Sequence, residues 1–208
     1  RRNGGFAEYV AVPEWNLVEL PAEVSFSTAA MLEPMAVAVH AMRQVPGDSL
    51  EKRTVAVCGA GTIGQLLVMF LRERGVRNLI VIGNKELQRQ KALECAADGD
   101  VFCDASGQDV VEFVAEHTGG KGADVFFECV GTNRSIGDAV QCAAPKGTVL
   151  LVGNPASDIS LDRDIYWMIL RNQLTLAGCW NSSFDPDSGE DDWNYVLESL
   201  QQQRIKPE

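Results

Sequence analysis

Thr54-Val-Ala-Val-Cys58, followed at once by Gly59-Ala-Gly-Thr-Ile-Gly64, is the stretch that decides the fold. Its first five residues are mostly apolar and β-branched, which predicts a buried strand. The Gly-x-Gly-x-x-Gly spacing predicts a tight turn that opens a helix, because apolar residues then recur every three or four positions. Gly75 is typical of the end of such a helix.

A glycine-rich turn between a strand and a helix is the context in which a dinucleotide binds. Gly59 allows the tight turn, and Gly61 lets backbone amides reach a pyrophosphate. Gly64 lets the helix press against the strand, while the helix start at Thr62 and Ile63 faces the anion. We therefore predict dinucleotide binding at this turn. The alternative is a glycine-rich turn that holds no ligand.

From residue 54 onward, predicted strands and helices alternate. Strands are expected at 54–58, 78–82, 100–103, 123–128, 147–152 and 174–179, and helices at 62–74, 85–97, 107–117, 133–143, 163–171 and 190–203. This alternation predicts an α/β fold with a doubly wound, six-stranded parallel sheet in the order 3-2-1-4-5-6. The ligand is expected at the carboxyl ends of the strands, where the order reverses.

Residues 1–50 contain too few predicted elements to form a domain. Gly4–Val12 alternates like a strand, and Asn16–Pro21 is a second extended piece. A helix capped by Ser25 or Ser27 is interrupted at Glu33-Pro34, and a second helix is expected over Met35–Arg43. We interpret 1–50 as the tail of a preceding domain with a connecting helix, and 51–208 as the dinucleotide-binding domain.

Composition excludes several classes of protein. The 208 residues are 46% apolar and 23% charged, and no apolar run approaches the roughly 18–20 residues of a membrane span. A formal net charge of −11 without a basic run argues against a nucleic-acid partner. We expect a cytoplasmic protein with no membrane partner. The first residue is Arg1 rather than Met, and we expect the chain to be a fragment of a longer protein.

The six cysteines form no C-x-x-C pair, so they predict no structural zinc site. We expect them to be buried free thiols. They are Cys58, Cys95, Cys103, Cys129, Cys142 and Cys179.

The predicted second strand ends in Gly83-Asn84-Lys85. An NAD-binding chain places Asp or Glu at this strand end, about 20 residues after the glycines, to bind the ribose hydroxyls. Gly83 removes the charge that would repel a 2′-phosphate. Asn84 can donate a hydrogen bond, and Lys85, with Arg89 one turn on, can supply positive charge. NADP is therefore favoured over NAD; the alternative is that Lys85 is an ordinary solvated lysine.

The ends of three further predicted strands are expected to line the crevice for the nicotinamide half of the dinucleotide. Gly131 and Gly153, at the ends of strands four and five, allow close backbone approach. The alternative is that they are plain strand-to-loop turns.

Glu33 lies in an apolar stretch between Leu32 and Pro34. A carboxylate there needs a partner if it is buried, and a metal ion would be one. One carboxylate does not make a metal site. His40, two turns on, is expected to be a hydrogen-bonded packing residue.

Several stretches together resemble the medium-chain, zinc-dependent alcohol and polyol dehydrogenases. They are G-G-F-A-E-Y-V-A-V-P at 4–13, M-L-E-P-M-A-V-A-V-H-A at 31–41, V-A-V-C-G-A-G-T-I-G at 55–64 and G-A-D-V-F-F-E-C-V-G at 122–131. The stretch L-R-N-Q-L-T-L-A-G-C-W-N-S-S at 170–183 is most similar to the galactitol-phosphate and sorbitol dehydrogenase branch.

The resemblance implies a GroES-like catalytic domain before the dinucleotide-binding domain. It implies that Glu33 is a catalytic residue and a zinc ligand, directly or through water. The zinc would polarise the alcohol oxygen of a small polyol or polyol phosphate while hydride passes to the nicotinamide. A homo-oligomer is also implied.

The same resemblance places further residues along the cofactor. Val37 would lie near the nicotinamide. The carboxamide would be held by backbone around Val152, Cys179 and Asn181. Cys129 and Val130 would flank the adenosine side.

The family's other zinc ligands and its C-terminal return lie outside these 208 residues. We therefore expect the chain to bind cofactor but not to turn over an alcohol. The competing interpretation is a zinc-free, NADPH-binding module of the quinone-reductase or sensory type. Glu33-Pro34 favours the zinc enzyme, because zinc-free relatives have no need of that carboxylate.

Overall fold

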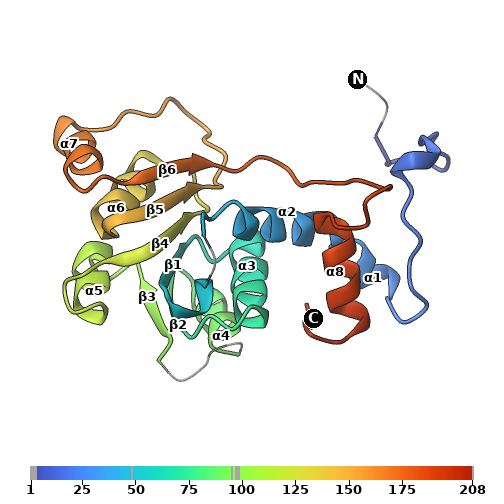
Figure 1. The fold of residues 1–208 in the computed structure, drawn as a ribbon, viewed down its shortest axis with the longest axis horizontal. Coiled ribbons are helices and arrows are strands. Elements are labelled where there is room, and N and C mark those ends of the chain that lie inside the picture. Colours follow the sequence, from blue (N-terminus) through green and yellow to red (C-terminus); the bar gives the residue numbers. More distant parts are fainter. Residues whose placement is uncertain (1–3, 48, 95, 97–98, 208) are drawn as a thin grey trace.

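The computed structural model describes residues 4–47, 49–94, 96 and 99–207. Six parallel strands form one sheet in the order β3-β2-β1-β4-β5-β6, which confirms the predicted doubly wound α/β fold. The arrowheads of β4, β5 and β6 point toward α2 (Figure 1). The strands are β1 Thr54–Cys58, β2 Asn78–Gly83, β3 Val101–Asp104, β4 Ala123–Glu128, β5 Ala143–Leu151 and β6 Thr175–Gly178.

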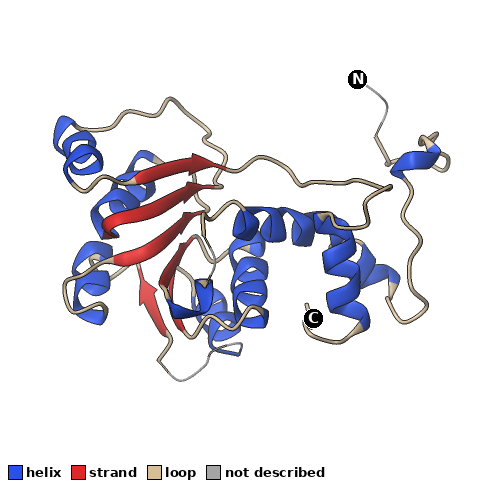
Figure 2. Cartoon of the chain, viewed as in Figure 1, coloured by secondary structure: helices blue, strands red, loops and turns tan. Residues whose placement is uncertain are grey.

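Helices cover both faces of the sheet (Figure 2). Those that alternate with the strands are α3 Thr62–Glu73, α4 Glu86–Glu94, α5 Val110–His117, α6 Asn133–Cys142 and α7 Arg163–Arg171. The first part of the chain forms α1 Phe26–Ala29 and α2 Leu32–Arg43, with short 3-10 turns at Glu14–Asn16 and Leu50–Lys52, and the last helix is α8 Asp192–Gln201. No helix within the described ranges is long and apolar enough to cross a membrane.

Alternation along β1 divides the interior into two hydrophobic cores. Val55 and Val57 pack in a core with residues of α2, α3 and α8, whereas Ala56 and Cys58 pack in a second core with residues of α5 and α6. Successive side chains of a strand point to opposite faces, so a strand with helices on both sides must be apolar throughout. This is why an unbroken apolar run at 54–58 predicts the central strand.

Helix α3 begins and ends as the glycines predict. Gly61 is its N-cap. At the other end Gly75 has φ +84°, and its N–H donates to the Arg72 carbonyl at 2.9 Å. The N–H of Val76 donates to the Leu71 carbonyl at 2.9 Å, so the last carbonyls of the helix are satisfied by a glycine turn.

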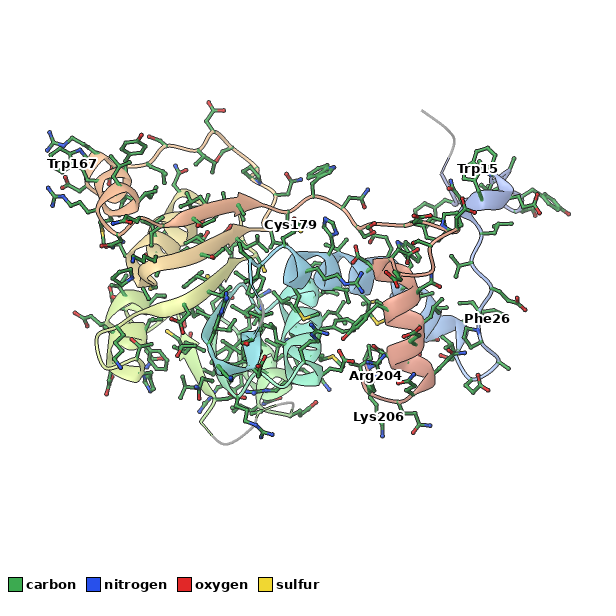
Figure 3. All side chains as sticks on the ribbon, viewed as in Figure 1. Trp15, Phe26, Trp167, Cys179, Arg204 and Lys206 are labelled. Carbon is green, nitrogen blue, oxygen red and sulfur yellow. The ribbon has the colours of Figure 1, made fainter. Side chains whose placement is uncertain are left out.

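Two expectations for the first 50 residues are wrong. Gly4–Val12 forms no strand, because its alternating side chains have no sheet to cover: Tyr9 is 92% exposed. Trp15 and Phe26, which follow this segment in the chain, also lie away from the sheet (Figure 3). The break between helices also falls earlier than Glu33-Pro34, since α1 ends at Ala29 and α2 already begins at Leu32. Pro34 is tolerated in the first turn of α2, where its missing N–H would have no helical partner.

Helix α8 is tied to α2 and α3 by buried polar contacts. Asp192 is 1% exposed, and its carboxylate binds His40 Nδ1 at 2.8 Å and Arg43 Nη1 at 2.9 Å. His40 is therefore a hydrogen-bonded packing residue, as predicted. Glu73 of α3 accepts from the Tyr195 hydroxyl and pairs with Arg204. These contacts join the last described part of the chain to α2 and α3.

Candidate dinucleotide-binding site

A cavity of about 500 Å³ lies at the carboxyl ends of β1, β2 and β4, where the strand order reverses. This is the edge of a doubly wound sheet at which ligands bind. Six residues predicted to bind the cofactor line it, and they are Gly59, Gly61, Gly83, Asn84, Cys129 and Val130. Sequence reasoning missed several other lining residues, among them Gln88, Ser106, Thr132, Arg134 and Asp138.

The glycine turn between β1 and α3 forms a cradle that side chains would fill. Gly59 has φ +100°, and a Cβ there would lie 2.8 Å from Val130 Cγ2. A Cβ on Gly64 would lie only 2.1 Å from the Gly59 carbonyl oxygen, so the helix start presses directly on the turn. A Cβ on Gly61 would meet no atom within 4 Å of it, which leaves its backbone open to the cavity. This geometry fits a pyrophosphate held by the amides at the start of α3, where Thr62 and Ile63 form the first turn.

Glu128 at the end of β4 is a buried carboxylate that shapes the opposite wall. It is fully buried, and its Oε1 accepts from the N–H groups of Val130 at 2.8 Å and Gly131 at 2.9 Å. Its backbone carbonyl accepts from Val152 and Gly153, both at 2.8 Å. One residue therefore fixes the turns after two strands. The signal in the sequence is a carboxylate directly after the apolar residues Val125, Phe126 and Phe127 of β4.

The turns after β4 and β5 are packed together through their glycines. Gly131 has φ +81°, and a Cβ on Gly153 would lie 2.3 Å from the Gly131 nitrogen. A side chain at Gly153 would push the two turns apart. The predicted close backbone approach is thus present, although what approaches each glycine is the neighbouring turn.

The thiols near the cavity are held in the neutral form. Burial, with a smaller contribution from the charge of Glu128, raises the pKa of Cys58 to about 12, and it raises the pKa of Cys129 as well. Burial also raises the pKa of Cys179 to about 11. A thiol with so high a pKa is a poor nucleophile at neutral pH. These cysteines are free, as expected; Cys95 lies outside the described residues.

At the end of β2, a side chain at the position of the usual acidic residue would displace two neighbouring side chains. A Cβ on Gly83 would lie 2.8 Å from Gln88 Oε1 and 2.8 Å from Phe102 Cζ. Gln88 Oε1 also accepts from the N–H of Asn84 at 3.0 Å. Lys85 is exposed and is not among the residues lining the cavity. The predicted glycine therefore lets Gln88 and Phe102 pack against the end of β2 and also leaves this position without a charge.

A carboxylate that sequence reasoning missed stands on the neighbouring strand. Asp104 pairs with Gly83 across the β2–β3 ladder. Its Oδ1 accepts from the Ser106 hydroxyl at 2.6 Å and from the Ser106 N–H at 3.0 Å. These hydrogen bonds, together with the charge of Arg89, lower the pKa of Asp104. Asp104 and Glu86, which lies 3.9 Å from Arg89 Nη1, thus add negative charge beside the positive charges of Lys85 and Arg89.

Comparison with known proteins assigns the family. The zinc-binding dehydrogenase family matches residues 62–202, from the last three residues of the glycine turn to the end of α8. The chain belongs to the zinc-binding dehydrogenase family. Galactitol 1-phosphate 5-dehydrogenase of Escherichia coli strain K12 is 27% identical to it over 208 residues, the whole chain and 59% of that protein. (R,R)-Butanediol dehydrogenase of Bacillus subtilis strain 168 is 37% identical over 150 residues, 72% of the chain and 42% of that protein.

Solved structures of zinc-binding dehydrogenases and their relatives have the same fold. That of galactitol-1-phosphate dehydrogenase from E. coli matches the whole chain, and 59% of its own length, with a TM-score of 0.86. A protein described as a zinc-binding dehydrogenase from Sinorhizobium meliloti 1021, bound to NADP, is 28% identical, with a TM-score of 0.82 over 99% of this chain and 57% of its own. An alcohol dehydrogenase from E. coli CFT073, complexed with NADH, is 26% identical, with a TM-score of 0.82 over 99% of this chain and 56% of its own. The chain spans less than two thirds of the length of each of these relatives.

In this zinc-binding dehydrogenase chain, the residues assigned to the nicotinamide side lie outside the 500 Å³ cavity. Val152 and Cys179 pack against the core that contains α2, and Val37 is half-buried in α2 itself. Asn181 has φ +63° just beyond β6. The N–H of Cys179 donates to the Leu151 carbonyl at 2.9 Å. This bond joins the end of β6 to the end of β5, just as the Glu128 carbonyl joins the end of β4 to the turn after β5.

Glu33 does not form a zinc site with the residues around it. It is exposed in the first turn of α2. Across the described part of the chain, no group of three His, Cys, Asp or Glu side chains could hold a metal ion. The described residues therefore fit a dinucleotide but do not form a three-ligand metal site.

Proposed function

We propose that this chain is the cofactor-binding part of a zinc-dependent oxidoreductase that transfers hydride between a nicotinamide dinucleotide and a polyol or polyol phosphate. The observation that carries the proposal is the Gly59–Gly64 cradle at the switch point of the sheet. The likeness to galactitol 1-phosphate 5-dehydrogenase over the whole chain supports the substrate class. The proposed boundary between the catalytic-domain tail and the cofactor domain lies near residue 50, and we propose a cytoplasmic homo-oligomer.

The residues of this chain bind and orient the cofactor. Amides at the start of α3 hold the pyrophosphate, and Glu128 fixes the turn of Val130 and Gly131 against which the adenosine side lies. Val37, Val152, Cys179 and Asn181 are proposed for the nicotinamide end. The bound nicotinamide supplies the hydride chemistry.

The test of this function is turnover by a protein that contains the whole chain together with the preceding catalytic segment. We expect zinc-dependent reduction of NADP or NAD with galactitol 1-phosphate or a free polyol as substrate. Activity that survives complete removal of zinc, with a quinone as acceptor, would instead support the zinc-free interpretation.

NADPH is expected to bind this chain about tenfold more tightly than NADH, because a partly exposed charge-assisted contact from Lys85 to the 2′-phosphate contributes roughly 1–3 kcal/mol. Lys85→Ala should remove most of the preference and leave NADH affinity nearly unchanged. The preference should fall as salt screens the contact. Titration of both cofactors at low and moderate salt measures it.

Two further variants sharpen this test. Asn84→Asp places a negative charge at the cavity and should weaken NADPH binding more than NADH binding; Gly83→Asp is unsuitable, because its side chain would meet Phe102 and Gln88. Lys121→Ala, an exposed lysine at the opposite end of the sheet, is the matched control and should change nothing. Equal affinities for the two cofactors would mean that Asp104 offsets Lys85 and that the chain does not select NADP.

The chain as it stands is expected to retain no tightly bound zinc. Catalytic zinc has three protein ligands, and Glu33 supplies one. Metal analysis after dialysis should find well below one zinc per chain, and one stoichiometric zinc would contradict this expectation. In a protein that contains the catalytic segment, Glu33→Ala should lower zinc retention or turnover, whereas unchanged values would make Glu33 structural.

A further inference from the structure

A second cavity, of about 480 Å³, lies at the amino ends of the strands, whereas the dinucleotide site lies at their carboxyl ends. It is bounded by the chain just before β1, the irregular part of β5 between Ala143 and Thr148, and the start of β6. Its lining residues are Pro46, Lys52, Arg53, Asp124, Pro145, Lys146, Gly147, Thr148 and Thr175.

Positive charge gathers in this cavity on a chain whose formal net charge is −11. Lys52, Arg53 and Lys146 contribute three cations from two separate segments. Asp124 is the single carboxylate among the described lining residues, and its Oδ2 accepts from the N–H of Thr54 at 2.8 Å. No ion pair within the described residues neutralises any of the three cations. The cavity lining therefore has a net positive charge.

Arg53 is held in place before any ligand arrives. It is half-buried, and its Nη2 donates to the Pro46 carbonyl at 3.0 Å. A Cβ on Gly47 would lie 2.9 Å from this Nη2, so the glycine leaves the space that the guanidinium occupies. A fixed guanidinium whose remaining N–H groups have no acceptor among the described residues suits an oxyanion, because little side-chain entropy is lost on binding.

Lys146 adopts a backbone conformation that lysine rarely takes. Its φ is +64°, and its N–H donates to the Asn172 carbonyl at 2.7 Å, which fixes the turn. A left-handed conformation favours glycine, and a side chain there costs stability. Strained residues of this kind cluster at ligand sites. A lysine in this conformation, at the lining of the cavity, suggests that its ammonium group binds a ligand there.

We propose that this cavity binds a small multivalent phosphate, either inorganic pyrophosphate or the phosphate group of a small ester. Lys52, Arg53 and Lys146 would neutralise the anion, and Thr148 and Thr175 line the same space. The site is separate from the pyrophosphate cradle at the carboxyl ends of the strands, and it does not depend on the proposed dehydrogenase activity.

The test is amide-resolved NMR titration of the chain with inorganic pyrophosphate and, separately, with glycerol 3-phosphate. Saturable shifts are expected at Arg53, Gly147 and Thr148. Lys146→Gly removes the cation and suits the left-handed backbone, so it should weaken this binding about tenfold or more without lowering the melting temperature. Gln203→Gly is the matched control: Gln203 has φ +53° away from the cavity, and its replacement should leave the titration unchanged.

Each outcome decides the proposal. Saturable shifts with either compound that are lost in Lys146→Gly but kept in Gln203→Gly support the site and identify the ligand as inorganic or as an ester. Pyrophosphate shifts confined to Gly59–Gly64 would show that only the dinucleotide cradle holds phosphate. Shifts that never saturate, or that are the same in Lys146→Gly, would likewise overturn the proposal.

Discussion

Gly64→Ala is expected to abolish dinucleotide binding and to destabilise the chain. The new Cβ would lie 2.1 Å from the Gly59 carbonyl oxygen, and both groups belong to backbone that cannot rotate away. Either α3 moves off β1 or the turn opens, and each change scatters the amides that face the pyrophosphate. Overpacking of this kind costs about 3 kcal/mol, which for a chain of this size lowers the melting temperature by roughly 6–12 °C.

Two other glycines separate the effect on binding from the effect on stability. Gly61→Ala places a methyl group where no atom lies within 4 Å, so the fold should be retained while binding is lost. Gly137→Ala, inside α6 and also free of contacts, should stabilise the chain by about 0.5–1 kcal/mol and leave binding unchanged. Thermal unfolding and NADPH titration of the three variants measure these outcomes. A Gly64→Ala chain with wild-type stability and affinity would refute the described contact between turn and helix.

Glu128→Ala is expected to have the second-largest effect. It leaves the N–H groups of Val130 and Gly131 without their acceptor and opens a cavity at the end of β4. Each buried unsatisfied group costs about 1–3 kcal/mol, so the free energy of unfolding should fall by about 3 kcal/mol or more. Cofactor affinity should fall with it, since the same turn borders the dinucleotide cavity. Urea unfolding and NADPH titration provide the two measurements.

Glu128→Gln is the matched control, because its amide oxygen can still accept both hydrogen bonds. It should retain most of the stability and affinity that alanine loses. If glutamine were as damaging as alanine, the negative charge, and not the acceptor geometry, would be what the turn requires. If neither variant changed stability, Glu128 would not hold the turn at all.

The fold could be predicted because its signals lie in local, contiguous patterns. The apolar run of β1, buried on both faces, and the helix limits set by Gly61 and Gly75 need no knowledge of distant residues. The alternating pattern at Gly4–Val12 wrongly predicted a strand, because strand formation there depends on residues elsewhere in the chain. A strand exists only where a partner strand pairs with it, and alternation alone does not supply one.

In the candidate site too, features set by local sequence could be predicted, and features set by contacts between separate segments could not. The glycine cradle could be predicted because it depends on backbone geometry within six residues. Asp104 and Gln88 could not, since their position beside Gly83 depends on strand pairing and on a side-chain contact across a turn. Glu128 is visible in the sequence as a carboxylate after three apolar residues. Its role as the acceptor for the Val130 and Gly131 N–H groups depends on the turn that follows.

An amide-resolved NMR titration of the wild-type chain with NADPH tests whether the chain binds a dinucleotide at the glycine cradle. We expect saturable, one-to-one shifts concentrated at Gly61, Thr62, Val130 and Gly131, with little change at the amino ends of the strands. Absence of saturable binding by either NADPH or NADH, or saturable shifts confined to residues away from the cradle, would contradict this expectation.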